Sequence, residues 1–368
     1  MKNLKKGKIP AGISMPDKIT IKISLIKPYA PFIHLLAMPG FSIVSEKEVS
    51  LGSGPMTGAY SQKTKTWNLK SRTDYFGKKS NLKSMNIREL KGLKKISDAF
   101  SKNEIDISMG FVVGDLEDLK LPKDVSIRKT DTLSYNHLFY NLNKKYFSNK
   151  EFRREFGQLL QSIAWKGEFL SGYQEPLNTF LPNGVMHSKY YKKKSIDINI
   201  NDFKKKWKNH LPSEKIKIVV VDKHFKTQFI NELEETLKNL GIKATVVKHS
   251  GTDYMTTLKT RDYDIISGPY IGNFPDPDGF LEPLNPESAI NFESKSTEGL
   301  FKNLQVARFK SDPSERLESY SKIIREYEDN WSMIPLYRVN FPIVYNKNLE
   351  VPDSSYRYEA ELWNIFWN

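Results

Sequence analysis

The stretch from residue 216 to residue 266 constrains the fold most, because its hydrophobic period changes from strand-like to helical and back. A β-branched run from Ile216 to Val221, interrupted only by Lys217, is typical of a strand buried on both faces. Gly241 follows a helical pattern, where a left-handed helix end is expected. The stretch predicts strands over 216–221, 242–247 and 263–266, and helices over 226–240 and 253–260. This alternation implies parallel strands joined by right-handed crossovers.

The loop that follows the third strand carries the candidate ligand-binding residues. Ligands of parallel sheets bind beyond the carboxyl ends of the strands, and residues 268–280 begin there. Asn273 offers a neutral amide, although Asn also serves as a turn residue. Tyr270 and Phe274 are interpreted as aromatic walls of a site, with core packing as the alternative. Gly272, which lies between them, is a further candidate ligand contact.

The rest of the chain predicts a mixed α/β protein. Apolar spacing from Asn149 onward is helical, with Ser148 or Asn149 as the N-cap, and Ser314–Trp331 is a long amphipathic helix. The remaining stretches predict strands over 17–25, 41–50 and 66–69, and an extended segment from Pro335 to Tyr345. Residues 87–96 and 105–113 are expected to complete a mixed unit that ends near residue 133.

Composition excludes several classes of protein. The 368 residues suffice for two domains, and the absence of cysteine excludes disulfides, thiolate metal sites and a cysteine nucleophile. The net charge of +14 includes lysine clusters at 192–194 and 204–206. A basic surface can attract nucleic acid, but nothing resembles a known nucleic-acid-binding motif. A solvated surface is favoured, and no nucleic-acid partner is expected.

Catalytic and metal chemistry find little support in the sequence. Asp276 and Asp278 could be a hydrolase pair, but within Asp-Pro-Asp-Gly they are expected to hold a turn. The turn at 52–55 lacks a phosphate-binding signature and is expected to be structural. The histidines form no metal-binding motif; they are His34, His137, His187, His210, His224 and His249. We predict no catalytic residues, no metal site and no cofactor.

Several motifs occur in the order found in one protein family. The stretch Asp262–Leu281 resembles a signature of the extracellular solute-binding proteins of peptide ABC transporters, family 5. In that signature a strand leads into an aromatic residue, then Gly-Asp, and finally the motif "DPdnFL". Asn273 stands where peptide receptors place the aspartate that pairs with the peptide's amino terminus. Weaker matches span the chain, at 17–25, 52–55 with Met56 for Tyr, 103–107, 138–153 with Glu155 for a small residue, and 331–337.

The resemblance implies a periplasmic-binding-protein-like type II fold, α/β and two-lobed with mixed sheets, whose N-terminal part is missing. Lobe I would comprise residues 1–133, lobe II residues 134–338, and residues 339–368 would return to lobe I. Near the suspected interlobe crossings, Phe139, Asn141 and Tyr337 become candidate ligand contacts.

The implied function is capture of a peptide or other small solute, not catalysis, followed by delivery to the membrane subunits of an ABC permease. The family is periplasmic or attached to the cell surface, although the basic start of this chain leads to no signal-peptide pattern. The alternative is a truncated or split derivative that binds no ligand and needs an N-terminal partner polypeptide. A hydrolase is a further alternative.

Overall fold

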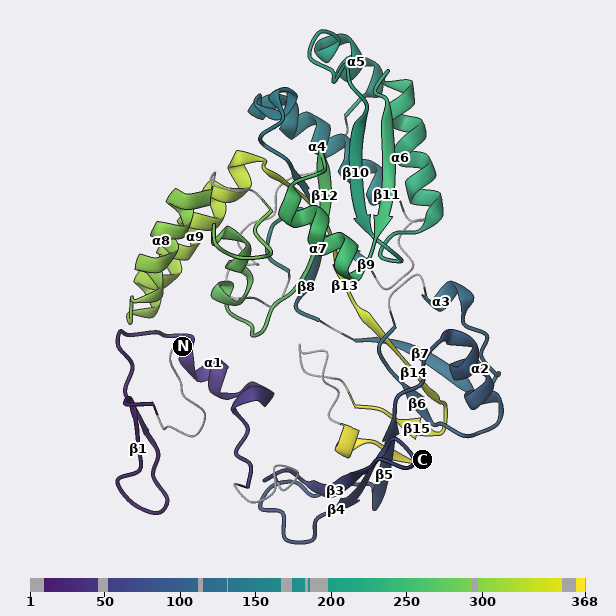
Figure 1. Ribbon diagram of the computed structural model, residues 1–368, viewed down its shortest axis with the longest axis vertical. Helices are drawn as coiled ribbons and strands as arrows, with labels where there is room; N and C mark the ends of the chain where they lie inside the picture. Colours follow the sequence, from purple (N-terminus) through teal and green to yellow (C-terminus); the bar gives the residue numbers. More distant parts are fainter. Residues whose placement is uncertain are drawn as a thin grey trace.

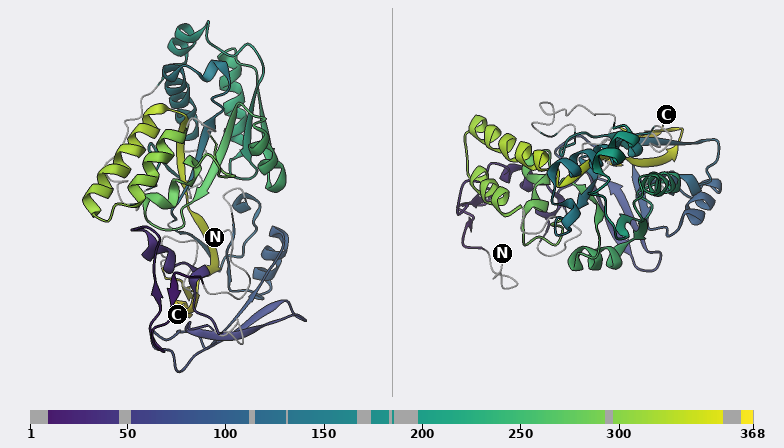
Figure 2. Two further views of the ribbon diagram at one scale, coloured as in Figure 1. Left: turned by 60° about the vertical axis from the view of Figure 1, so that its left-hand side comes forward. Right: turned by 90° about the horizontal axis from the view of Figure 1, so that it is seen from above.

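The chain folds into two lobes, which occupy the upper and lower halves of Figure 1 and are seen from two other sides in Figure 2. This computed structural model describes residues 10–45, 52–111, 115–130, 132–166, 174–182, 185, 198–292, 297–352 and 362–367. The upper, large lobe contains a six-stranded sheet, and the lower, small lobe contains shorter sheets. The expected two-lobed α/β architecture with mixed sheets is confirmed.

The sheet of the large lobe has the strand order β11-β10-β12-β8-β13-β9. Its strands are β8 (Ser134–Tyr140), β9 (Gln174–Pro176), β10 (Ile216–Val221), β11 (Ala244–His249), β12 (Ile265–Ile271) and β13 (Met333–Val339). Strand β10 runs parallel to β11 and β12, which confirms the predicted parallel unit, whereas β8 pairs antiparallel with β12 and β13. The loop after β12 therefore begins at the end of a central strand.

The helices of the large lobe cover both faces of this sheet (Figure 1). They are α4 (Lys150–Ala164), α5 (Ile200–Trp207), α6 (Thr227–Asn239), α7 (Gly251–Thr260), α8 (Glu298–Arg308) and α9 (Pro313–Asn330). The Asn149 side chain accepts hydrogen bonds from the amides of Glu151 and Phe152, so Asn149 is the N-cap of α4. Gly241, with φ +84°, follows α6 in the predicted left-handed conformation.

Strand β10 places side chains in two separate hydrophobic cores. Ile218 and Val220 pack in the core that contains Phe156, whereas Val219 packs in the core that contains Tyr320. All three strand residues are at most 1% exposed. The alternation of a strand explains why an almost continuous apolar run was required here.

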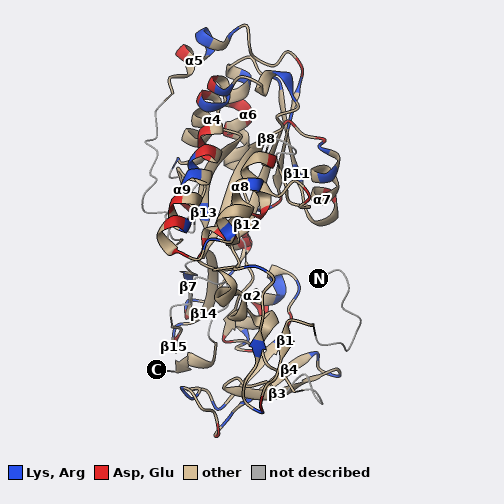
Figure 3. Cartoon of the chain, turned by 90° about the vertical axis from the view of Figure 1, so that its left-hand side faces the viewer, with Lys and Arg blue, Asp and Glu red and all other residues tan. Residues whose placement is uncertain are grey.

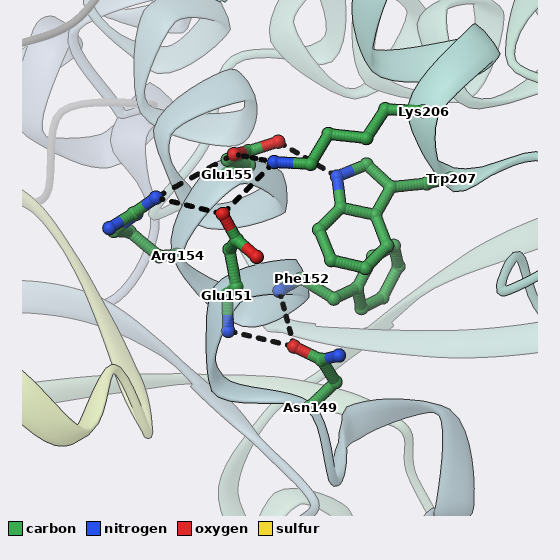
Figure 4. A network of polar contacts seen from close by, with 7 residues as sticks. All are labelled: Asn149, Glu151, Phe152, Arg154, Glu155, Lys206 and Trp207. Carbon is green, nitrogen blue, oxygen red and sulfur yellow. Dashed lines mark hydrogen bonds and ion pairs between the residues drawn. The ribbon is translucent and has the colours of Figure 1, made fainter.

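A polar network joins α4 to α5 (Figure 4). Glu155 accepts hydrogen bonds from Lys206 Nζ at 2.6 Å and from Trp207 Nε1 at 2.8 Å. Lys206 Nζ also contacts Glu151 at 3.0 Å. Glu155, which departs from the family's small residue, therefore holds α5 against α4.

Positive charge is distributed among acidic side chains in this lobe. Figure 3 shows lysine and arginine interspersed with aspartate and glutamate along α9 and at the tip formed by α5. Lys206 belongs to the lysine cluster at 204–206 and forms ion pairs with two carboxylates, those of Glu151 and Glu155. The other cluster, at 192–194, lies outside the described residues.

The small lobe contains two three-stranded sheets, with orders β3-β4-β5 and β6-β14-β7. The elements of this lobe are β3 (Met56–Ser61), β4 (Thr66–Ser71), β5 (Ser84–Arg88), α2 (Leu93–Ser101), β6 (Ile107–Ser108), α3 (Asp115–Asp118), β7 (Val125–Thr130), β14 (Phe341–Asn346), β15 (Leu349–Glu350) and β16 (Phe366–Trp367). The predicted strand at 66–69 is confirmed, and the stretch at 105–113 contributes the two-residue strand β6.

The predictions for the N-terminal segment, residues 10–45, were largely wrong. Instead of a strand over 17–25, the chain forms a two-residue pairing of β1 (Ile13–Ser14) with β2 (Lys22–Ile23), followed by α1 (Phe32–Leu36). Ile19 and Ile21 are 96% and 57% exposed. Their alternation meets no neighbouring sheet among the described residues, so no ladder extends along it. The strand expected at 41–50 is reduced to a bridge between Val44 and Gly52, and residues 46–51 lie outside the description.

Among the described residues, the chain passes between the two lobes after β7 and again before β14 (Figure 1). The Asn340 side chain donates to Glu175 Oε1 at 3.0 Å, and Lys129 of β7 contacts the same oxygen at 3.0 Å. Arg338 of β13 contacts the other oxygen of Glu175 at 2.5 Å. Glu175 therefore gathers donors from both sides of the crossing.

Candidate functional site

The site loop is defined here as residues 269–280, the end of β12 and the short 3₁₀ helix η4 (Pro277–Phe280). The Gly272 amide donates to the Leu133 carbonyl at 2.7 Å. A Cβ at position 272 would lie 2.1 Å from Phe280 Cζ. Gly272 is therefore required for packing of the Phe280 ring, and a contact between Gly272 and ligand stays a prediction.

Asn273 and Tyr270 carry the polar side chains of the site loop that retain solvent exposure. Asn273 is exposed, and within the described part of the chain its side chain makes no hydrogen bond. Tyr270 is partly exposed and packs against Tyr135, with ring centroids 5.6 Å apart. Burial, together with the nearby charges of Glu282 and Asp278, raises the pKa of Tyr270 to about 12, which keeps its hydroxyl protonated. The site loop thus carries a neutral amide at position 273 and a neutral hydroxyl at position 270.

Phe274 lies at the back of the loop and is covered by the N-terminal segment. Its side chain is 3% exposed, and its ring stacks on that of His34 with centroids 5.7 Å apart and an interplanar angle of 3°. The aromatic wall expected at Phe274 is therefore occupied on one face by a protein side chain.

Two buried acidic residues hold the loop in place. Asp276 Oδ1 accepts a hydrogen bond from the Asp278 amide at 2.9 Å, which confirms its predicted turn-holding role. Arg316 Nη2 of α9 lies 2.6 Å from the same oxygen. Asp278 accepts from Arg308 Nε of α8 at 2.6 Å and from Tyr320 OH at 3.0 Å.

These contacts oppose the hydrolase alternative for the acidic loop. Asp276 and Asp278 are 2% and 5% exposed, and each is bound by an arginine from a neighbouring helix. Such carboxylates link elements of the fold and are not presented to a substrate. Each arginine compensates the charge of the buried carboxylate that it contacts, so an acidic turn can be packed inside the large lobe.

The other predicted ligand contacts point into the large lobe. Phe139 is fully buried and stacks on Phe292, with centroids 4.2 Å apart. The Asn141 amide donates to the Tyr263 carbonyl at 2.8 Å, at the far end of β8. Tyr337, 2% exposed, donates to the His224 carbonyl at 2.9 Å. All three side chains serve packing or backbone bonding, so the proposed site omits them.

The remaining candidate sites are structural where they are described. Arg72 Nη1 donates to the Gly52 carbonyl at 3.1 Å, and the Arg72 amide donates to the Pro55 carbonyl at 2.9 Å. These hydrogen bonds stabilise the turn at 52–55 and use two of its carbonyl groups. His187 lies outside the described residues, and among those described no group of three metal-binding side chains gathers. None of the described helices is long and apolar enough to cross a bilayer.

Sequence reasoning missed two sets of residues around the site. Tyr29 and His34 reach the loop from the N-terminal segment, more than 200 residues away in sequence. Arg308 and Arg316 occur within helical patterns that give no sign of a partner. No local sequence signal could have identified these contacts.

Comparison with known proteins identifies the family. The model of the bacterial extracellular solute-binding proteins, family 5 middle region, matches residues 2–292. The chain belongs to this family. Its biochemical class is therefore solute binding, as the motifs predicted.

Relatives extend the comparison to most of the chain. The probable D,D-dipeptide-binding periplasmic protein DdpA of Escherichia coli K12 is 22% identical, over 92% of this chain and 69% of that protein. DppA from Helicobacter pylori in complex with the peptide STSA has a TM-score of 0.72 and 19% identity, covering 97% of this chain and 74% of that one. NikA from Brucella suis in complex with Fe(III)-EDTA has a TM-score of 0.79 and 14% identity, covering 97% and 79%. At these identities the solved structures establish a shared fold.

Proposed function

We propose that this protein is the substrate-binding component of an ABC importer and that its solute is a peptide or peptide-like molecule. Family membership carries the class of function, and the exposed, neutral Asn273 amide carries the choice of solute. An amide can both donate to and accept from a peptide backbone, and the protonated Tyr270 hydroxyl adds a second polar contact.

The proposed mechanism is closure of the two lobes around the solute. Residues 1–133 and 339–368 would form the small lobe and residues 134–338 the large lobe, with the crossings on either side of Glu175 as the hinge. Ligand shifts the equilibrium toward the closed state only by the difference in its affinity for the two states. The closed form would then dock on the membrane subunits of the permease, outside the cytoplasmic membrane.

The neutral side chain at position 273 predicts how the solute's end is recognised. A carboxylate would make a charge-assisted hydrogen bond to an ammonium group, about twice as strong as a neutral one. Asn273→Asp should therefore raise affinity for peptides with a free amino terminus by on the order of 10-fold. Binding to the same peptides with an acetylated amino terminus should not improve.

Isothermal titration calorimetry with free and acetylated alanine peptides of two to five residues would test this prediction. Asn86→Asp, an exposed position on β5 of the small lobe, adds the same charge away from the site and serves as the control. Equal affinities for wild type and Asn273→Asp across the whole panel would remove Asn273 from the proposed site.

One observation favours a second candidate, a derivative that needs a further polypeptide. Apolar side chains of the N-terminal segment and of β4 lack cover, with Ile19, Ile26 and Trp67 being 96%, 100% and 42% exposed. Exposed apolar surface of this kind marks protein contacts. Native mass spectrometry separates the two candidates: a monomer with a bound small mass supports solute binding, and an empty, self-associated species supports the derivative.

A further inference from the structure

The N-terminal segment is fastened to the site loop by three side-chain contacts. Tyr29 OH donates to Asp278 Oδ2 at 2.5 Å, and His34 stacks on Phe274. Lys27 Nζ lies 4.5 Å from the centroid of the Phe309 ring, at the end of α8. In Figures 1 and 2 the purple helix α1 accordingly lies directly beneath the loops of the large lobe.

Asp278 is a fixed anchor for this contact. Its carboxylate is 5% exposed and is already bound by Arg308 and Tyr320, both of which belong to the large lobe. Loss of the bond from Tyr29 would therefore leave the carboxylate with two donors. Burial and the charge of Asp278 raise the pKa of Tyr29, so its hydroxyl stays a donor at neutral pH.

The segment lies beside the residue that presents the free amide. His34 covers Phe274, the immediate neighbour of Asn273, and is itself partly exposed. The chain leaves this segment through α1 and meets the small lobe at the bridge between Val44 and Gly52. Residues 27–34 are thus held by the large lobe along their length, and Val44 ties the continuation of the segment to the small lobe.

We propose that residues 27–34 form a wall of the solute site beside Asn273, and that the Tyr29–Asp278 hydrogen bond latches this wall in place. Tyr29 is a positioning residue that acts through Asp278, whereas the partly exposed His34, which covers Phe274, would contact the solute. This assignment rests on the proposed function, because it names a second side of the same site. It adds two residues that no local motif of the chain indicates.

Tyr29→Phe removes the latch and leaves the ring, and Tyr320→Phe is its matched control. Each variant deletes one hydroxyl donor to the same carboxylate, but Tyr320 belongs to α9 and joins only parts of the large lobe. Because the chain has no cysteine, Lys18→Cys and Lys302→Cys, both at exposed positions, can be labelled for fluorescence energy transfer between the segment and α8.

Without ligand, Tyr29→Phe should shift the labelled pair to longer and broader distances, and Tyr320→Phe should keep the wild-type distribution. His34→Ala should also lengthen the distances, whereas His34→Phe, which preserves a stacking ring, should restore them. Identical distributions for Tyr29→Phe and Tyr320→Phe would overturn the latch.

Calorimetry with free and acetylated tetra-alanine completes the test. Tyr29→Phe should weaken binding by on the order of 10-fold, as expected for loss of a hydrogen bond to a charged group, and Tyr320→Phe should weaken it less. Equal losses in the two variants would overturn the role of Tyr29 as a positioning residue. If the wild-type protein bound neither peptide, the proposed solute class would fail, and the energy-transfer distances would still decide the latch.

Discussion

Acidification should destabilise this protein through one buried histidine in the central sheet. His137 of β8 is fully buried, and its Nδ1 accepts a hydrogen bond from the Leu336 amide at 3.2 Å. Its Nε2 therefore carries the proton and donates to the Phe180 carbonyl at 3.0 Å. Protonation of Nδ1 would abolish the bond to Leu336 and bury a charge. Burial accordingly lowers the pKa of His137 from 6.5 to about 4.

The magnitude follows from proton linkage. Below pH 6.5 this histidine is protonated in the unfolded chain but stays neutral in the folded protein. Acid therefore favours unfolding until the pH approaches 4. Between pH 8 and pH 5 the free energy of unfolding should fall by about 2 kcal/mol, and the full loss should be about 3 kcal/mol. Burial also lowers the pKa of His224, which adds a contribution of the same sign.

Urea unfolding of wild type and His137→Gln at several pH values from 8 to 4.5 isolates the contribution of His137. Glutamine does not titrate in this range, so the substitution itself changes stability by the same amount at every pH. The comparison therefore concerns the slope of the unfolding free energy against pH and not its absolute value. We expect its pH dependence to be weaker than that of wild type by about 2 kcal/mol over pH 8 to 5. His210→Gln, a partly buried histidine that contacts the Tyr146 carbonyl, is the control. Parallel slopes for wild type and His137→Gln would refute the reasoning.

Two further substitutions test how the site loop is held, both by thermal and urea unfolding. Gly272→Ala should destabilise by about 1–3 kcal/mol because its Cβ would clash with Phe280, whereas Gly299→Ala, with no atom within 4 Å, should not destabilise. A neutral Gly272→Ala would show that the ring can move aside. Arg316→Met leaves buried Asp276 without its arginine and should cost about 3–5 kcal/mol, against about 0–1 kcal/mol for Lys310→Met in the exposed pair with Glu315. Equal costs would contradict the assigned role of Asp276.

The predicted elements were most accurate where neighbouring residues alone decide the structure. The unit from β10 to β12, the Asn149 cap and the left-handed Gly241 were all predicted, because period, capping and backbone sterics are local properties. Asp276 in its turn belongs to the same class, since its partner amide is two residues away.

Where side chains face was decided only by tertiary structure. The motifs that contain Phe139 and Tyr337 do not distinguish a side chain that contacts ligand from one that packs in a core. The packing of the large lobe buries both side chains. The alternating isoleucines at 19–25 predict a strand, yet a strand also needs a partner to supply its hydrogen bonds.

Local sequence patterns were sufficient to predict the family, the parallel unit and the loop that presents Asn273. It could not reveal that Asp278 binds Tyr29, Arg308 and Tyr320, which lie 249, 30 and 42 residues away. A carboxylate has no sequence pattern that specifies its donors, because hydrogen bonds and ion pairs depend on separation in space. The arrangement of the lobes alone brings the N-terminal segment to the site loop.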